Sequence, residues 1–257
     1  MSTGRARVIR NVSPRSARIG AIAAVALLTN VAVAAETDEK ETFGTFGGSV
    51  MLATDYMFRG ISNSNEEFQI RGDINWSHSS GFYAGLWASN TDFGGPGNSM
   101  ELDPYIGYAN SIGDSGFSYD VGYWSYNYPG SEADLDYGEF YAIGTYTVGS
   151  FYVSPSFWYA DNYFGKDFLD GVSGLAYAVT AGMQLPGGMD LSARVGEQTF
   201  DSGASELDYL YYDVGVSKPV AGFSLSLRWH DTDDVKPGLA DPDLADGRFV
   251  FSVTRSF

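Results

Sequence analysis

The side chains that most often carry protein chemistry are scarce in this chain. Its 257 residues include no cysteine and only two histidines, His78 and His230. A thiolate nucleophile, a disulfide framework and a cysteine metal site are therefore excluded. His230 stands beside Asp231, and in an alternating strand it would share a face with Ser224 and Ser226. We place His78 in a turn, interpret His230 as a member of a polar network, and predict no catalytic residues, no enzyme activity and no cofactor.

The densest group of carboxylates lies between residues 231 and 246. It consists of Asp231, Asp233, Asp234, Asp241, Asp243 and Asp246. Carboxylates at this density could hold Ca²⁺, but the segment lacks both the spacing of an EF-hand loop and its closing glutamate. We favour a solvated acidic loop that meets lipopolysaccharide through loosely held divalent ions, and we predict no metal site.

A second set of charges is spread along the chain at positions that share one face of alternating segments. It contains seven acids and four arginines: Asp55, Arg59, Arg71, Asp73, Asp103, Asp120, Glu139, Asp190, Arg194, Asp213 and Arg228. If these side chains converge on one interior, they could form ion pairs that fill and stiffen it. They could also line a charged constriction that selects solutes, and the surplus of acids would then favour cations.

Strict alternation of apolar and polar residues supplies the elements that would position these charges. Between Phe68 and Ser77, aromatic and aliphatic residues or glycine occupy one face, and Arg71 and Asp73 lie on the other with further polar residues. Twelve such segments are predicted, at residues 48–59, 68–78, 81–90, 100–112, 117–128, 136–148, 151–163, 176–185, 189–199, 209–218, 223–231 and 247–257. The chain is therefore expected to be all-β.

The connections between these segments alternate in length. The short ones are residues 79–80, 113–116, 149–150, 186–188 and 219–222, and the long ones are 60–67, 91–99, 129–135, 164–175, 200–208 and 232–246. This sorting is typical of a transmembrane antiparallel up-and-down β-barrel with short periplasmic turns and long extracellular loops. No loop is obviously long enough to fold into the lumen. If Phe58 and Phe68 close the first hairpin, Asp55 faces Arg71 across the strand pair.

The first 35 residues resemble a secretory leader, because a basic stretch precedes an apolar run that ends in small residues. We predict a signal peptide over residues 1–34, cut after Ala34 or Ala35, then a short periplasmic segment over 35–47 and the barrel over 48–257. Removing five leader arginines from a chain of net charge −17 leaves 10 basic and 32 acidic residues. Such acidity argues against nucleic acid and against docking on anionic lipid.

Several segments resemble a known family. The opening at residues 53–62, Ala-Thr-Asp-Tyr-Met-Phe-Arg-Gly-Ile-Ser, is similar to that of the TorF family of proteobacterial porins, also catalogued as Gcw_chp. Residues 81–90, 101–105 and 252–257 continue the similarity over the whole predicted barrel. The resemblance implies an outer-membrane barrel with a transport role. Phe257 on an amphipathic last strand resembles the signal read by the barrel-assembly machinery, although Arg255 stands where an apolar residue is usual.

Three functions remain open from the sequence. The first is a passive channel in the cell outer membrane for small hydrophilic solutes, which prefers cations. The second is a non-conducting structural or interaction barrel that presents acidic loops outside. The third, a lipid-modifying enzyme, would need a Ser-His-Asn type of site on the lipid-facing wall, whereas His230 is expected to face the lumen. Lipids, lipopolysaccharide, the barrel-assembly machinery and small solutes are the expected partners.

Overall fold

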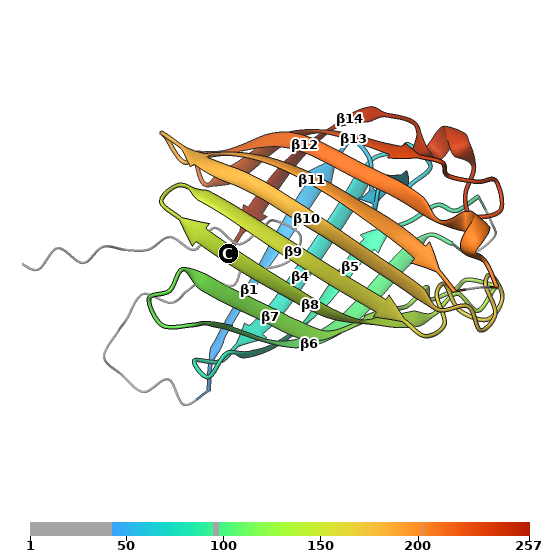
Figure 1. Ribbon diagram of the computed structural model, residues 1–257, viewed down its shortest axis with the longest axis horizontal. Helices are drawn as coiled ribbons and strands as arrows, with labels where there is room; N and C mark the ends of the chain where they lie inside the picture. The colour runs from blue at the N-terminus through green and yellow to red at the C-terminus, as the bar shows by residue number, and fades with distance from the viewer. Residues whose placement is uncertain (1–42, 95–97, 202) are drawn as a thin grey trace, which may run out of the picture.

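The computed structural model describes residues 43–94, 98–201 and 203–257, and the predicted leader lies outside them. Within these residues, twelve antiparallel strands form one closed barrel in which each strand pairs with its sequence neighbour and β1 closes on β14 (Figure 1). The strands are β1 (Thr45–Ala53), β4 (Gln69–Ser77), β5 (Phe82–Asn90), β6 (Met100–Ser111), β7 (Phe117–Tyr126), β8 (Tyr137–Val148), β9 (Phe151–Ala160), β10 (Gly174–Leu185), β11 (Met189–Phe200), β12 (Tyr209–Val220), β13 (Phe223–Asp233) and β14 (Arg248–Ser256). The predicted barrel is confirmed.

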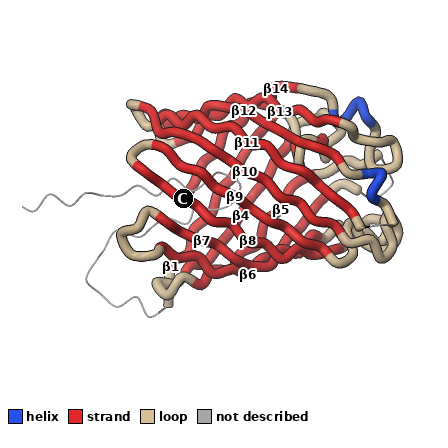
Figure 2. The backbone as a smooth tube through the Cα atoms, viewed as in Figure 1, coloured by secondary structure: helices blue, strands red, loops and turns tan. Residues whose placement is uncertain are grey.

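The two ends of the barrel differ in the length of their connections, as predicted (Figure 2). We call the end with residues 78–81, 112–116, 149–150, 186–188 and 221–222 the short-turn end. The opposite, long-loop end carries a two-stranded hairpin, β2 (Met57–Phe58) and β3 (Ile61–Ser62), and two short 3₁₀ turns, η1 (Ser205–Leu207) and η2 (Pro242–Ala245). In the described residues, no helix is long and apolar enough to cross a membrane.

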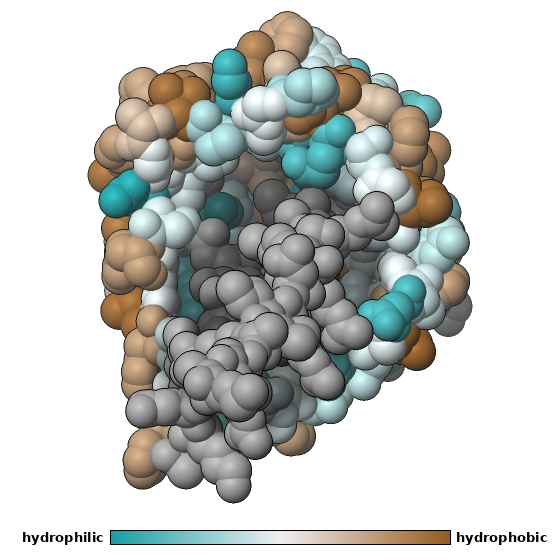
Figure 3. All heavy atoms as spheres, turned by 90° about the vertical axis from the view of Figure 1, so that its left-hand side faces the viewer, coloured by the Kyte–Doolittle hydropathy of each residue, from teal (hydrophilic) through white to brown (hydrophobic). Residues whose placement is uncertain are grey.

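The outer surface is apolar because the strands turn their hydrophobic faces outward. Aliphatic side chains such as Ile70, Ile74 and Leu227 are about half exposed, although a water-soluble protein would bury them. Aromatic residues including Phe117 and Phe223 begin strands at the short-turn end. Figure 3 looks at this end and shows hydrophobic residues around the outside and hydrophilic residues around the opening. This distribution is that of a barrel wall in lipid.

The first strand differs from its prediction at both ends. β1 begins at Thr45, which pairs with Ser77, so it includes three residues that were assigned to the preceding segment. It ends at Ala53, and Arg71 lies opposite Met51. The predicted cross-strand pair of Asp55 with Arg71 is therefore wrong. The reason is that the chain leaves the barrel wall after Ala53 and does not continue the alternating strand to residue 59.

We call residues 54–68 the inward hairpin, because the part that contains β2 and β3 folds into the lumen, whereas residues 65–68 are exposed. The prediction that no loop is long enough to do so is wrong, since the early end of β1 lengthens this connection. The two residues between β2 and β3, Arg59 and Gly60, have positive φ angles of 48° and 85°. Such angles belong to the tight hairpin turns that match the twist of the flanking strands. The hairpin is held at its base, where the Asp55 carboxylate accepts hydrogen bonds from Ser62 and Ser64.

Candidate functional site

All eleven charged residues predicted to line the lumen point to the interior. Nine of them lie on inward-facing positions of strands, whereas Asp55 and Arg59 lie on the inward hairpin. Sequence reasoning missed Glu101 and Arg248, which also face inward at the long-loop end. Glu101 is two residues from Asp103 and therefore lies on the same face of β6. Arg248 is the first residue of β14 and has the parity of its inward face, so the rule that residues i and i+2 share a face would have found both.

Arg59 fastens the inward hairpin to the far wall of the barrel. Its Nη2 donates to Oε2 of Glu139 at 2.7 Å, and its Nη1 donates to Oε1 of Gln198 at 2.6 Å. Glu139 on β8 and Gln198 on β11 lie across the barrel from β1 and β4, which the hairpin joins. Arg59 is only 8% exposed, and both of its partners are fully buried. The guanidinium therefore bridges the lumen in a water-poor environment, where a charge has to be paired.

Aromatic side chains fill the rest of the lumen at this level. The Phe58 ring lies 5.8 Å from that of Tyr126, whose hydroxyl donates to Glu139 at 2.9 Å. The surrounding buried cluster contains Tyr56, Trp87, Tyr105, Trp124, Tyr128, Leu135, Tyr137, Tyr163, Phe200 and Leu207 among its larger members. The half of the lumen nearest the long loops is therefore occupied by a packed core around the inward hairpin.

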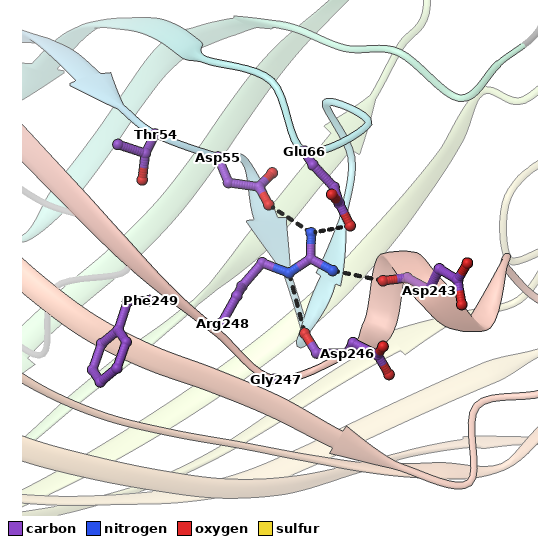
Figure 4. Close-up of a pocket in the computed structure, with 8 residues that line it drawn as sticks. All are labelled: Thr54, Asp55, Glu66, Asp243, Asp246, Gly247, Arg248 and Phe249. Carbon is purple, nitrogen blue, oxygen red and sulfur yellow. Dashed lines mark hydrogen bonds and ion pairs between the residues drawn. The ribbon is translucent and has the colours of Figure 1, made fainter.

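The last long loop is tied to the base of the inward hairpin by Arg248 (Figure 4). Nη1 of Arg248 lies 3.1 Å from the Asp55 carboxylate and 2.9 Å from that of Glu66. The guanidinium also donates to the backbone oxygens of Asp243 and Asp246. These residues surround a pocket of about 450 Å³. Arg248 thus neutralises acids of the inward hairpin, and it meets the predicted acidic loop at backbone oxygens. In the described part of the chain, no group of three or more acidic or histidine side chains is arranged to hold a metal ion.

Two other long loops are joined at the surface. The Lys166 ammonium contacts the Asp134 carboxylate, and the backbone N–H of Asp134 donates to Oδ2 of Asp167 at 2.8 Å. The hydrogen bond from Lys166 lowers the pKa of Asp134 below its ordinary value. Both side chains of the pair are largely exposed, so the pair contributes little to stability.

The half of the lumen towards the short-turn end has a different construction. Three carboxylates on its wall are held by tyrosine hydroxyls. Tyr105 donates to Asp73 at 2.8 Å, and Tyr83 donates to Asp120 at 2.5 Å. Asp190 accepts hydrogen bonds from Tyr152 at 3.2 Å and from Gln184 at 2.6 Å. Among the described residues, none of the three carboxylates forms a salt bridge.

Glycines on neighbouring strands make room for these tyrosine rings. A Cβ atom added at Gly85 would collide with the Tyr105 ring, and one added at Gly182 would collide with Tyr152. At Gly107 the added atom would meet Tyr83 and also Tyr141, whose hydroxyl contacts that of Tyr83. Each ring therefore lies along the wall over a glycine, and its hydroxyl reaches a carboxylate without the ring crossing the lumen.

The wall formed by β11, β12 and β13 carries two arginines around one acid. Nε of Arg194 donates to Oδ2 of Asp213 at 2.6 Å, and Arg228 contacts the other oxygen of the same carboxylate. Arg228 also donates to the Ser192 hydroxyl at 2.7 Å. His230, 8% exposed, lies opposite Asp213 in the strand register and faces the lumen as predicted. Around Asp213 one carboxylate faces two guanidinium groups, which leaves a positive charge near mid-height, whereas Asp190 lies on the same wall nearer the short-turn end.

Residues 37–257 match the model of a family described as "Bacterial protein of unknown function (Gcw_chp)". The chain belongs to the Gcw_chp family. Among solved structures, it is similar to the NanC porin, with a TM-score of 0.54 and 6% identity over 82% of this chain and 98% of that one. At this identity the likeness shows the fold alone. No curated protein matches the sequence significantly.

Two further solved structures match this Gcw_chp barrel less well. A porin matches with a TM-score of 0.41 and 15% identity over 74% of this chain, which spans 62% of the porin's length. The outer membrane phospholipase A from Escherichia coli matches with a TM-score of 0.46 and 14% identity over 86% of this chain and 93% of that one.

The packing of tyrosine rings over glycines predicts that some glycine-to-alanine substitutions destabilise the Gcw_chp barrel. Gly107→Ala should destabilise the folded barrel by about 1–3 kcal/mol, because the added methyl group overpacks Tyr83 and Tyr141. Gly144→Ala is the matched control: its added atom has only Pro155 within 4 Å, at 3.9 Å, so it should be neutral or stabilise through lower entropy of the unfolded chain. Urea unfolding in detergent micelles measures both. Equal midpoints for the two variants would contradict the proposed packing.

Proposed function

We propose that this Gcw_chp barrel is a channel in the cell outer membrane for small hydrophilic solutes and that it prefers cations. The long-loop end faces the exterior and the short-turn end the periplasm, which is the usual orientation of such barrels. The TorF resemblance of residues 53–62 supports a transport role. The observation that carries the proposal is the set of three carboxylates, Asp73, Asp120 and Asp190, that face the lumen without a salt bridge.

Uncompensated carboxylates in a narrow aqueous passage raise the local concentration of cations and repel anions. The arginines of the lumen counteract this field only in part. Arg59 is neutralised by Glu139, Arg194 and Arg228 share Asp213, and Arg71 offsets one charge beside Asp73. The remaining charge of the short-turn half is therefore negative, which supports a preference for cations.

The inward hairpin serves as the gate in this proposal. Its side-chain hydrogen bonds to Glu139 and Gln198 on the far wall come from Arg59, and the hairpin strands β2 and β3 pair only with each other. When the hairpin withdraws, the space that it fills becomes continuous with the short-turn half of the lumen. The packed core around Arg59 also favours a second candidate, a non-conducting barrel that presents its acidic loops outside, in which the hairpin never leaves.

Two further parts of the proposal concern chemistry and assembly. Catalysis on lipid is not proposed, since His230 faces the lumen beside Asp213, away from the lipid-facing wall. Phe257 is 74% exposed at the short-turn end, where it is accessible to the barrel-assembly machinery. Lipopolysaccharide meets the exposed acids of the long loops through divalent ions.

The test is a planar lipid bilayer that holds the refolded barrel between unequal concentrations of potassium chloride. A cation-preferring channel gives a reversal potential whose sign corresponds to potassium permeation. An opposite sign would contradict the charge layout. Absence of conductance, with folding confirmed by circular dichroism, would favour the non-conducting barrel.

A further inference from the structure

Charges of opposite sign face each other across the middle of the barrel. Asp73 is the fifth of nine residues in β4, and Asp120 is the fourth of ten in β7. On the other side, Arg194 is the sixth of twelve residues in β11, and Arg228 is the sixth of eleven in β13. The strand order places β8, β9 and β10 between these groups on one side and β14 and β1 on the other. The two acids and the two arginines therefore lie on opposite walls near mid-height.

The two walls differ in net charge as well as in composition. Asp73 and Asp120 accept hydrogen bonds from tyrosine hydroxyls, which hold the carboxylates in place without cancelling their charge. Arg71, two residues from Asp73 on the inward face of β4, offsets one of the two charges, so this wall keeps a net negative charge near mid-height. At mid-height, Arg194 and Arg228 share the single carboxylate of Asp213, so one positive charge remains there; Asp190, on the same wall, lies four residues nearer the short-turn end than Arg194. A solute at mid-height thus experiences an electric field directed across the lumen, because low-dielectric walls concentrate the field between fixed charges.

These groups are in contact with solvent. The side chains of Arg194 and Arg228 are 14% and 24% exposed, and Asp73 and Asp120 are both partly exposed. Arg59 and its partners Glu139 and Gln198 lie nearer the long-loop end, so the inward hairpin does not separate the middle of the lumen from the short-turn end. In Figure 3, hydrophilic residues line the part of the inner rim that is in view at that end.

We infer that the middle of the lumen is a binding site for small zwitterions, with the ammonium group of the solute at Asp73 and Asp120 and its carboxylate at Arg194 and Arg228. This inference rests on the proposed channel function and specifies its class of solute. A molecule with one charge gains attraction from one wall and repulsion from the other. A zwitterion aligned across the lumen is attracted by both walls, and its groups replace water around charges that are already positioned.

The experiment measures binding, which does not depend on whether the gate opens. The full mature barrel, refolded in detergent micelles, is titrated by calorimetry with γ-aminobutyrate and separately with butylammonium and butyrate. These probes have the same carbon chain and differ in charged groups. We expect γ-aminobutyrate to bind at least about tenfold more tightly than either singly charged probe, which corresponds to about 1.4 kcal/mol.

Variants test each wall separately. Asp73→Asn with Asp120→Asn should abolish the advantage of γ-aminobutyrate over butyrate, and Arg228→Gln should abolish its advantage over butylammonium. Asp114→Asn, in an exposed short turn, should leave all three affinities unchanged. Equal affinities of the wild-type barrel for the three probes, or no binding of γ-aminobutyrate, would overturn the inference.

The bilayer measurement on the same preparation separates this inference from the channel proposal. Conductance without binding of γ-aminobutyrate would overturn the zwitterion site and leave the channel. Binding of γ-aminobutyrate without conductance would overturn the channel and support the site within a closed barrel.

Discussion

Replacing Arg59 by alanine together with Glu139 by glutamine should open the long-loop end of the barrel and raise its mean conductance in planar bilayers about tenfold. Arg59 makes two short hydrogen bonds across the lumen, one to Glu139 and one to Gln198. Hydrogen bonds to charged groups contribute about 1.5–3 kcal/mol each. Losing about 1.4 kcal/mol from the closed state already changes the ratio of open to closed channels tenfold.

The double variant is preferable to Arg59→Ala alone. The single change leaves the fully buried Glu139 carboxylate without its cation, and breaking a buried pair in this way costs about 3–5 kcal/mol. The single change would therefore destabilise the whole barrel as well as the closed position of the inward hairpin. Lys166→Ala is the matched control, because it removes an exposed ion pair between two other long loops that contributes little to stability. Wild-type conductance in the double variant, with folding retained, would show that the hairpin is not the gate.

The faces of the strands were predictable from the sequence because the side-chain period of a strand is fixed by its pleat. Asp73 and Asp120 could be assigned to the lumen from this period alone, once their segments were recognised as strands. The end of β1 was not predictable in the same way. Tyr56 and Phe58 continue the apolar alternation of β1, but hydrogen bonds from Ser62 and Ser64 to Asp55 favour a separate hairpin. Local polar contacts of this kind compete with the strand ladder and leave no periodic signal.

The hydrogen bonds and ring contacts between side chains in the lumen depend on strand register, which the sequence leaves open. The hydroxyls of Tyr83 and Tyr141 meet across a separation of 58 residues, and Arg59 reaches Gln198 across 139. The glycine that accommodates a tyrosine ring is recognisable only when the two strands are aligned, as for Gly107 beside Tyr83 in the pairing of β5 with β6. Composition showed abundant tyrosine and glycine, but it could not show that they act together.

The second large effect expected concerns ion selectivity. Replacing Asp73 and Asp120 together by asparagine should reduce the ratio of cation to anion permeability several-fold and move the reversal potential towards zero. A unit charge 4 Å from a passing cation contributes about 1 kcal/mol even at the dielectric constant of water, which is roughly fivefold in occupancy. Asparagine has nearly the shape of aspartate, and its oxygen can still accept the hydrogen bonds from Tyr105 and Tyr83, so the barrel should stay folded.

Salt concentration and a control variant make this selectivity prediction specific to the two lumen carboxylates. The difference between wild type and variant should be largest in dilute salt, because the Debye length falls from about 30 Å at 0.01 M to about 3 Å at 1 M. Asp114→Asn removes the same charge from an exposed turn at the short-turn end and should change the reversal potential little. If it shifts the potential as much as the double variant does, selectivity arises at the mouth of the barrel. If neither variant shifts it, the arginine-bearing wall governs permeation, since that wall then outweighs the two carboxylates opposite it.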